Sequence, residues 1–139
     1  MKFYRFKRAA SLVSVKCTES FCILFFSKIV LVLRKSSLVK IREIPGSFTG
    51  ALELDFNLLL FSVLTHEIVR FSMIENSRHS FYLPMEHDLL TVDVCSVKKF
   101  VVAITRHRNA PRTNSVVFWT WSNSQFLYIF DEKRSIQAI

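Results

Sequence analysis

Eleven short apolar runs separated by polar breaks make up most of the chain after residue 20, and this pattern limits the folds that the chain can adopt. Most runs are four to eight residues long and enriched in Val, Ile and Phe, which is typical of β-strands. They cover residues 22–26, 28–34, 37–44, 51–56, 58–65, 67–74, 80–83, 89–95, 99–105, 115–121 and 126–130. The breaks contain turn formers such as Ser, Asn and Pro. The pattern predicts an all-β chain, although residues 52–65 also fit a helical period.

Glycine is scarce, with two residues among 139, whereas phenylalanine occurs 14 times. Because glycine adopts positive φ at the lowest cost, we expect few tight hairpin turns of the kind that need it. Such a small number of turn-forming glycines also fits an unselected reading frame with no defined function. That alternative stays open beside a folded domain.

The basic charge is concentrated in the first third of the chain. Residues 1–42 contain ten Lys and Arg against Glu19 alone, a net charge of +9. The other residues contain nine basic and ten acidic side chains, a net charge of −1, so a nucleic-acid-binding face is not expected. Residues 1–20 are expected to form a basic N-terminal segment. Its candidate contacts to an anionic surface are Lys2, Arg5, Lys7 and Arg8.

The same segment also fits a membrane-surface helix, because Phe3, Phe6, Ala10 and Val13 share one helical face. The most apolar run, 21–33, would extend about 20 Å as a helix against a bilayer core of about 30 Å. Lys28 lies near its centre, so a spanning helix is not expected. The alternative is a small membrane-associated protein held by residues 1–33.

Three cysteines, Cys17, Cys22 and Cys95, form neither a zinc-binding pattern nor a disulfide framework. Scattered thiols are typical of reducing compartments, where they pack as small hydrophobic side chains. The corresponding expectation is a cytoplasmic location.

Catalytic motifs are excluded by composition and spacing. The two glycines cannot form a dinucleotide-binding or phosphate-binding loop, and no nucleophile elbow occurs. One grouping has metal-ligand chemistry, and we expect its members to be solvated loop residues: His66, Glu67, His79, Glu86, His87 and Asp88. The sequence therefore predicts no enzyme activity, no cofactor and no metal.

Residues 51–83 and 89–130 resemble each other in the order of their parts. In each, a strand ending near an aspartate precedes a strongly apolar strand, a break with a histidine, a strand with a central aromatic residue, a polar turn and an aromatic strand. Residues 28–47 supply a third, partial copy. Four strands in about forty residues are typical of a propeller blade. We expect a β-repeat region at 21–134, with partial blades at about 21–50, 51–88 and 89–130, and a C-terminal tail at 131–139.

The second copy resembles a blade of the WD-repeat family, whose third strand commonly carries a tryptophan where Trp119 stands. Residues 98–121, "KKFVVAITRHRNAPRTNSVVFWTW", are also similar in layout to blades of cilia- and flagella-associated WD-repeat proteins. The chain lacks the Gly-His pair and the Asp-Gly turn of the family, and Thr120 stands where aspartate would follow the tryptophan. The resemblance implies a non-enzymatic scaffold with protein partners in a cytoplasmic, ciliary or flagellar setting.

Trp119 and Trp121 are two residues apart and therefore point to the same face of a strand. With Tyr128 of the next strand, we expect them to form the structural core of this hairpin rather than a stacking platform for bases. Propellers close with about four to eight blades, so three blades leave the ring open. We expect missing blades or another chain to complete it.

Overall fold

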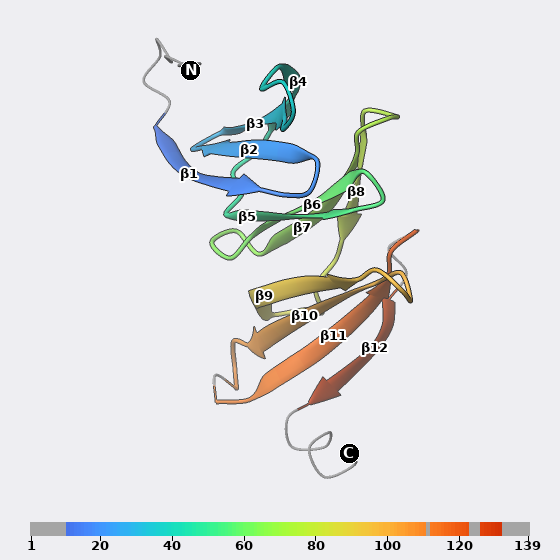
Figure 1. The fold of residues 1–139 in the computed structure, drawn as a ribbon. Coiled ribbons are helices and arrows are strands. Elements are labelled where there is room, and N and C mark those ends of the chain that lie inside the picture. Colours follow the sequence, from blue (N-terminus) through green and yellow to red (C-terminus); the bar gives the residue numbers. More distant parts are fainter. Residues whose placement is uncertain (1–10, 111, 123–125, 132–139) are drawn as a thin grey trace. The chain divides into compact units, whose positions relative to one another are not determined.

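The computed structural model describes residues 11–110, 112–122 and 126–131, the last of these without side chains (Figure 1). These residues form strands and no helix, which confirms the predicted all-β class. No described segment is a helix long and apolar enough to cross a membrane. The strands are β1 (Leu12–Cys17), β2 (Phe21–Phe26), β3 (Ile29–Arg34), β4 (Lys40–Pro45), β5 (Gly50–Leu54), β6 (Asn57–Ser62), β7 (Glu67–Ser72), β8 (Ser77–Phe81), β9 (His87–Cys95), β10 (Phe100–His107), β11 (Asn114–Thr120) and β12 (Phe126–Asp131).

The strands form three four-stranded antiparallel sheets, β1-β2-β3-β4, β5-β6-β7-β8 and β12-β11-β10-β9. Each strand pairs with its neighbour in sequence, as a meander of hairpins requires. This confirms the predicted architecture of three blade-like sheets. The first sheet begins with β1, so the helical alternative for the N-terminal segment is wrong for residues 12–17. Alternating apolar residues in this stretch suit an edge strand, which pairs with β2.

Most turns obtain positive φ without glycine. The loops 63–66, 73–76 and 96–99 each end with a residue in the left-handed region: His66 (61°), Asn76 (53°) and Lys99 (55°). The β5–β6 connection is a two-residue turn in which both Asp55 (52°) and Phe56 (60°) have positive φ. Two successive positive φ values define the primed turn that matches strand twist, and it is built here from residues that adopt it at a cost.

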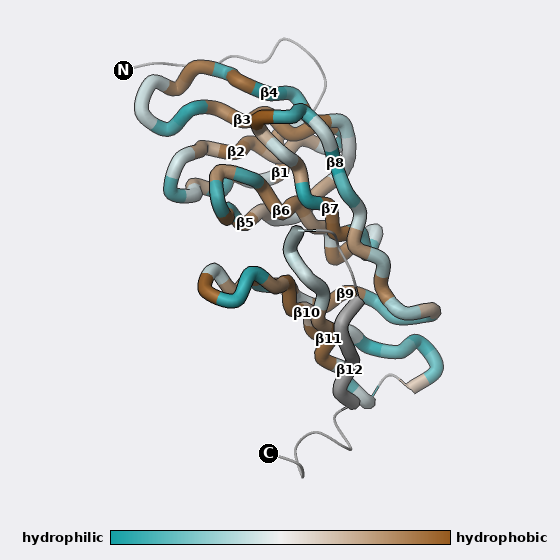
Figure 2. The backbone as a smooth tube through the Cα atoms, turned by 90° about the vertical axis from the view of Figure 1, so that its right-hand side faces the viewer, coloured by the Kyte–Doolittle hydropathy of each residue, from teal (hydrophilic) through white to brown (hydrophobic). Residues whose placement is uncertain are grey.

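The chain divides into two compact units, Met1–Phe48 and Thr49–Ile139. In the first, alternate residues of β2 and β3 are buried, among them Phe21, Ile23 and Val32, whereas every residue of β1 is exposed. In the second unit, the sheets β5–β8 and β9–β12 pack face to face. Their core contains Leu54, Leu59, Ile68, Phe81, Leu89, Val92, Val101, Ala103, Val117, Trp119 and Trp121. Strands β6 and β10 are largely hydrophobic, whereas the chain just after β10 is hydrophilic (Figure 2).

Candidate interaction surface

The two tryptophans lie in the core between the two sheets of the second unit. Trp119 is 1% exposed and Trp121 is 6% exposed, and both belong to the core cluster. The Trp119 indole Nε1 donates a hydrogen bond of 3.2 Å to the Tyr82 carbonyl oxygen. The Phe81 ring meets the Trp119 ring edge to face, with centroids 6.0 Å apart. Trp119 is therefore held by packing and by its one polar atom.

Arg70 of β7 contacts the residues that directly follow β11, and it thereby links the two sheets of the second unit. Its guanidinium donates hydrogen bonds to the carbonyl oxygens of Trp121 and of Ser122, the latter at 2.6 Å. It also lies over the Trp121 ring, 5.7 Å from the ring centroid. Burial lowers the pKa of the Arg70 guanidinium, but arginine remains a cation at neutral pH. Nη1 donates both hydrogen bonds, and the planar, charged guanidinium also matches the aromatic face of Trp121.

For two groups of predicted site residues, the structure describes only some of the side chains or none of them. Tyr128 is on β12, opposite Phe118 of β11 in the register. Its side chain is outside the described part of the chain, as are the four N-terminal cations Lys2, Arg5, Lys7 and Arg8. Their expected roles stay predictions.

A hydrogen-bonded network joins the start of β9 to the end of β10. His87 is the first residue of β9 and is buried, unlike the solvated loop residue that we expected. Its Nδ1 lies 2.8 Å from the Thr105 hydroxyl, and its ring meets the His107 ring edge to face at 5.1 Å. Asn109 donates from its backbone to His107 Nδ1 and from its side chain to Glu86, at 3.0 and 2.9 Å. The network ties the loop after β10 to the strand beside it.

A second set of polar contacts connects the two sheets at Asp88. Arg108 Nε donates to Asp88 Oδ1 at 2.8 Å, and His66 Nε2 lies 3.4 Å from the same oxygen. His66 Nδ1 accepts a hydrogen bond of 3.0 Å from the Leu89 backbone. The Arg108 hydrogen bond is the main reason that the pKa of Asp88 is below its usual value. In the described part of the chain, no three His, Cys, Asp or Glu side chains are placed to hold a metal ion.

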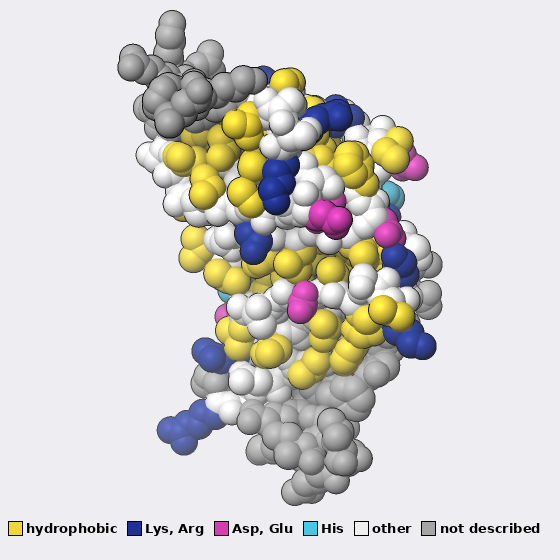
Figure 3. Space-filling view, viewed as in Figure 1, with side chains coloured by type: hydrophobic (Ala, Val, Ile, Leu, Met, Phe, Trp, Pro, Cys, Tyr) yellow, Lys and Arg dark blue, Asp and Glu magenta, His cyan; other side chains and the backbone are white. Residues whose placement is uncertain are grey.

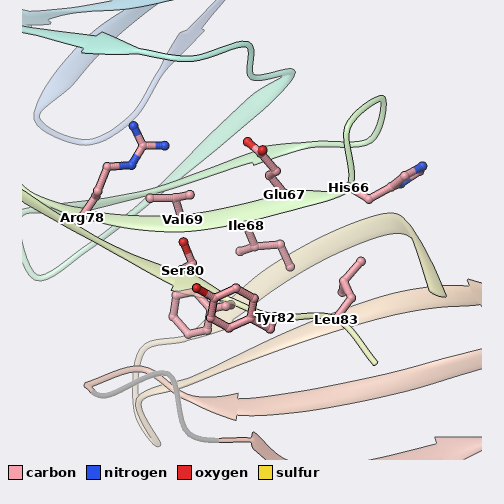
Figure 4. A pocket seen from close by; sticks show the side chains of 9 residues that line it. His66, Glu67, Ile68, Val69, Arg78, Ser80, Tyr82 and Leu83 are labelled. Carbon is pink, nitrogen blue, oxygen red and sulfur yellow. The ribbon is translucent and has the colours of Figure 1, made fainter. Parts of the chain in front are cut away.

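A shallow hollow of about 210 Å³ lies on β7 and β8 (Figure 4). In Figure 4, Glu67, Val69, Arg78 and Ser80 point to one side of the hairpin, whereas Ile68 points to the other, where the core lies. His66 also borders the hollow, but its Nδ1 is occupied by the Leu89 backbone. This open site does not assemble a nucleophile, a base and an orienting group.

The two central strands of the sheet β9–β12, β10 and β11, carry apolar side chains on both faces, whereas the outward-facing residues of β9 include Thr91 and Asp93. Core residues Val101 and Ala103 alternate along β10 with residues that face the opposite way, and β11 follows the same alternation. We call these opposite residues the outer face: Phe100, Val102, Ile104, Val116 and Phe118. The Phe100 and Phe118 rings are 5.5 Å apart, and Ile104 is 38% exposed. Hydrophobic side chains gather over this part of the molecule in Figure 3.

No protein-family model matches the sequence, and no curated protein sequence matches it. Solved structures do match. The WD40 repeats of RRP9 give a TM-score of 0.65 at 10% identity, over 90% of this chain and 40% of that chain. The β-propeller domain of the Trilobed protease from Pyrococcus furiosus, with its open velcro topology, gives 0.65 at 9%, over 94% and 46%. Kuenenia stuttgartiensis hydrazine synthase gives 0.63 at 14%, over 81% and 34%.

The class that the fold defines is therefore the β-propeller. The similarity at these identities concerns the fold, and it does not select a particular WD-repeat family. The chain spans less than half the length of each of these three structures. Its three four-stranded sheets correspond to an incomplete propeller, since a closed ring has about four to eight.

Proposed function

We propose that this chain is a non-enzymatic part of a protein-interaction scaffold, and that the outer face of β9–β12 is one of its binding surfaces. The observation that carries the proposal is the apolar character of β10 and β11 on both faces. A sheet with one solvated face alternates apolar and polar side chains, whereas a sheet covered on both faces is apolar throughout. Over residues 100–104 of β10 and 116–119 of β11, core residues alternate with outer-face residues that are also apolar.

The occupant of the outer face is a further four-stranded sheet with an apolar face of its own. Two observations favour it over a helix or a small ligand. The inner face of the same sheet already packs against the sheet β5–β8 in this way, through residues such as Ile68 and Val101. The chain also spans only 34 to 46% of the length of the three similar structures described above, and a closed propeller needs at least one further four-stranded sheet.

The energetic gain from covering the outer face is substantial. Full burial of a Val, Ile or Phe side chain stabilises by about 1.5–3 kcal/mol relative to exposure, and the outer face contains five such residues that are not fully buried. A contiguous apolar patch of this kind is typical of a protein interface. In the isolated chain, the outer face of a second copy is the apolar sheet available to cover it.

Sedimentation velocity of the purified chain tests this proposal through two matched substitutions. Ile104→Asp places a charge on the outer face, and Ile74→Asp makes the same change on a residue that is 82% exposed in the β7–β8 loop. We expect the wild-type chain to self-associate, Ile104→Asp to weaken association by at least about tenfold, and Ile74→Asp to leave it unchanged. A monomeric wild-type chain, or equal weakening by both substitutions, would contradict the proposal.

Several expectations from the sequence remain part of this proposal. The similar structures include hydrazine synthase, so the absence of enzyme activity rests on the missing catalytic motifs. These structures lend no support to a ciliary or flagellar role. The cytoplasmic location and the contact of the N-terminal cations with an anionic surface stay predictions from the sequence.

A further inference from the structure

Two of the three cysteines face each other across the first hairpin. Cys17 is the last residue of β1, and it lies directly opposite Cys22 of β2 in the strand register. The two sulfur atoms are 3.5 Å apart. Directly opposite residues of antiparallel strands have Cα atoms about 4.5–5.5 Å apart, which is within the range of about 4.4–6.8 Å that a disulfide needs. The backbone of this hairpin can therefore accept a disulfide without rearrangement.

The surroundings of the two thiols differ in a way that suits stepwise oxidation. Cys17 is exposed, whereas Cys22 is half-buried. Burial is the main reason that the pKa of the Cys22 thiol is raised, and the contact with Cys17 acts in the same direction. Lys35 opposes this effect; its Nζ donates a hydrogen bond of 3.1 Å to the Thr18 carbonyl oxygen, next to Cys17 in sequence. Cys17 is the thiol that an incoming reagent reaches first.

We propose that Cys17 and Cys22 form a reversible modification site, which low-molecular-weight disulfides such as oxidised glutathione convert into a cross-strand disulfide. On this proposal, Cys17 and Cys22 do more than pack as small hydrophobic side chains. The disulfide closes the short loop of residues 18–21 and fixes the end of the edge strand β1 to β2. The third cysteine, Cys95, lies at the end of β9 in the other unit.

The reaction balances as two thiol–disulfide exchanges. The Cys17 thiolate attacks one sulfur of oxidised glutathione, its proton passes to solvent, and one glutathione thiolate leaves. Cys22 then loses its proton and attacks the Cys17 sulfur of the mixed disulfide, which releases the second glutathione. The two protein thiols are oxidised, one glutathione disulfide is reduced to two glutathione molecules, and reduced glutathione in excess reverses both steps.

Peptide mapping of the full-length chain after equilibration in glutathione buffers tests the proposal. Trypsin cleaves after Lys16 and Lys28, so one peptide, 17–28, contains both cysteines, and another, 79–98, contains Cys95 alone. We expect peptide 17–28 to lose two hydrogen atoms, and peptide 79–98 to remain a thiol or to gain glutathione. The matched control is the same chain unfolded in guanidinium chloride, for which half-oxidation should need at least about tenfold more oxidised glutathione.

Three results would overturn the proposal. One is an equal midpoint of oxidation for the folded and unfolded chains, because the fold then contributes nothing. The second is a peptide 17–28 that carries glutathione instead of losing hydrogen. The third is a disulfide that links either cysteine to Cys95 or to a second chain. A Cys17→Ser chain is the negative control, in which peptide 17–28 cannot lose the two hydrogen atoms.

Hydrogen exchange of the oxidised chain tests whether the disulfide fixes β1. Edge strands open locally at low cost, so we expect the amides of β1 to exchange at least about tenfold more slowly once the disulfide forms. The edge strand β8 of the other unit serves as the internal control and should not change. Equal exchange of β1 in the two redox states would contradict the fixing of the strand.

Discussion

At the residue scale, some of the side chains that stabilise the second unit can be predicted from the sequence and others cannot. The two-residue spacing of Trp119 and Trp121 predicts a common face, and both are in the core. Arg70 could not be predicted, because its acceptors at residues 121 and 122 are brought to it only by sheet packing. Thr105 becomes a partner of His87 only through the β9–β10 hairpin, which sets the register of the two strands.

Replacement of Arg70 tests the link between β7 and the end of β11. We expect Arg70→Ala to lower the free energy of unfolding by about 1–3 kcal/mol, since two charge-assisted hydrogen bonds and the stacking on Trp121 are lost. Arg70→Lys keeps the charge but not the planar guanidinium that lies over Trp121, so its effect should be a large fraction of this loss. Urea unfolding measures both. Arg112→Ala, which removes an exposed loop arginine, should stay within about 0.5 kcal/mol of wild type.

The buried hydroxyl of Thr105 provides a second test. Thr105→Val keeps the shape of the side chain and removes the hydroxyl that lies 2.8 Å from His87 Nδ1. We expect a loss of about 1–3 kcal/mol in the free energy of unfolding. Thr91→Val, the same change at an exposed position of β9, is the matched control. Equal effects of the two substitutions would show that the hydroxyl of Thr105 contributes nothing specific.

The Asp88 contact makes a pH-dependent contribution to stability. Arg108 lowers the pKa of Asp88 in the folded chain, so the contribution is fully present above the pKa of the unfolded chain. It is lost as pH falls below about 4 and through the lower pKa of the folded state. We expect Asp88→Asn to flatten the decline of thermal stability between about pH 4 and pH 2. Glu67→Gln, which removes an exposed carboxylate of β7 outside this contact, is the control, and equal flattening by both substitutions would contradict the role of the Asp88 contact.

At the element scale, the strands were easier to predict than their ends. The apolar run 58–65 continues through Val63 and Leu64, yet β6 ends at Ser62, because those two residues form an exposed turn. The turn needs a left-handed residue, which His66 supplies where glycine is usual. β1 cannot be recognised from the sequence, because its alternating residues lie in a basic segment that also fits a helix. It is an edge strand with every side chain exposed, so no buried stripe marks it in the sequence.

The two-residue turn between β5 and β6 tests the cost of positive φ in this chain. Phe56 has a φ of 60°, so we expect Phe56→Gly to stabilise the chain by about 0.5–1 kcal/mol. Phe56→Ala removes the same side chain without relieving the backbone and should give no such gain. Thermal or urea unfolding of the two variants separates these effects. If alanine stabilises as much as glycine, the ring and not the backbone is the source of the cost.

At the scale of the whole molecule, repetition in the sequence was the informative signal. Two copies with the same order of strands, breaks and aromatic positions predicted blade-like sheets, although glycine-based turns and the Gly-His pair are missing. Positive φ from residues such as Asn76 and Lys99 replaces the glycines, and hydrogen bonds of His87 and Thr105 join β9 to β10 at the start of the third sheet. The outer face cannot be predicted from the sequence, because an apolar residue can be assigned to it only after the core face of the same strand has been located.

Residue-resolved amide hydrogen exchange of the purified chain tests the three-sheet architecture most directly. The central strands of each sheet, β2 and β3, β6 and β7, and β10 and β11, pair on both sides. We predict that their amides exchange most slowly, and that the loops 63–66, 73–76 and 96–99 interrupt this protection with fast exchange. Uniformly fast exchange along the chain would contradict the account and favour an unselected reading frame, and continuous protection across these loops would contradict the strand assignment.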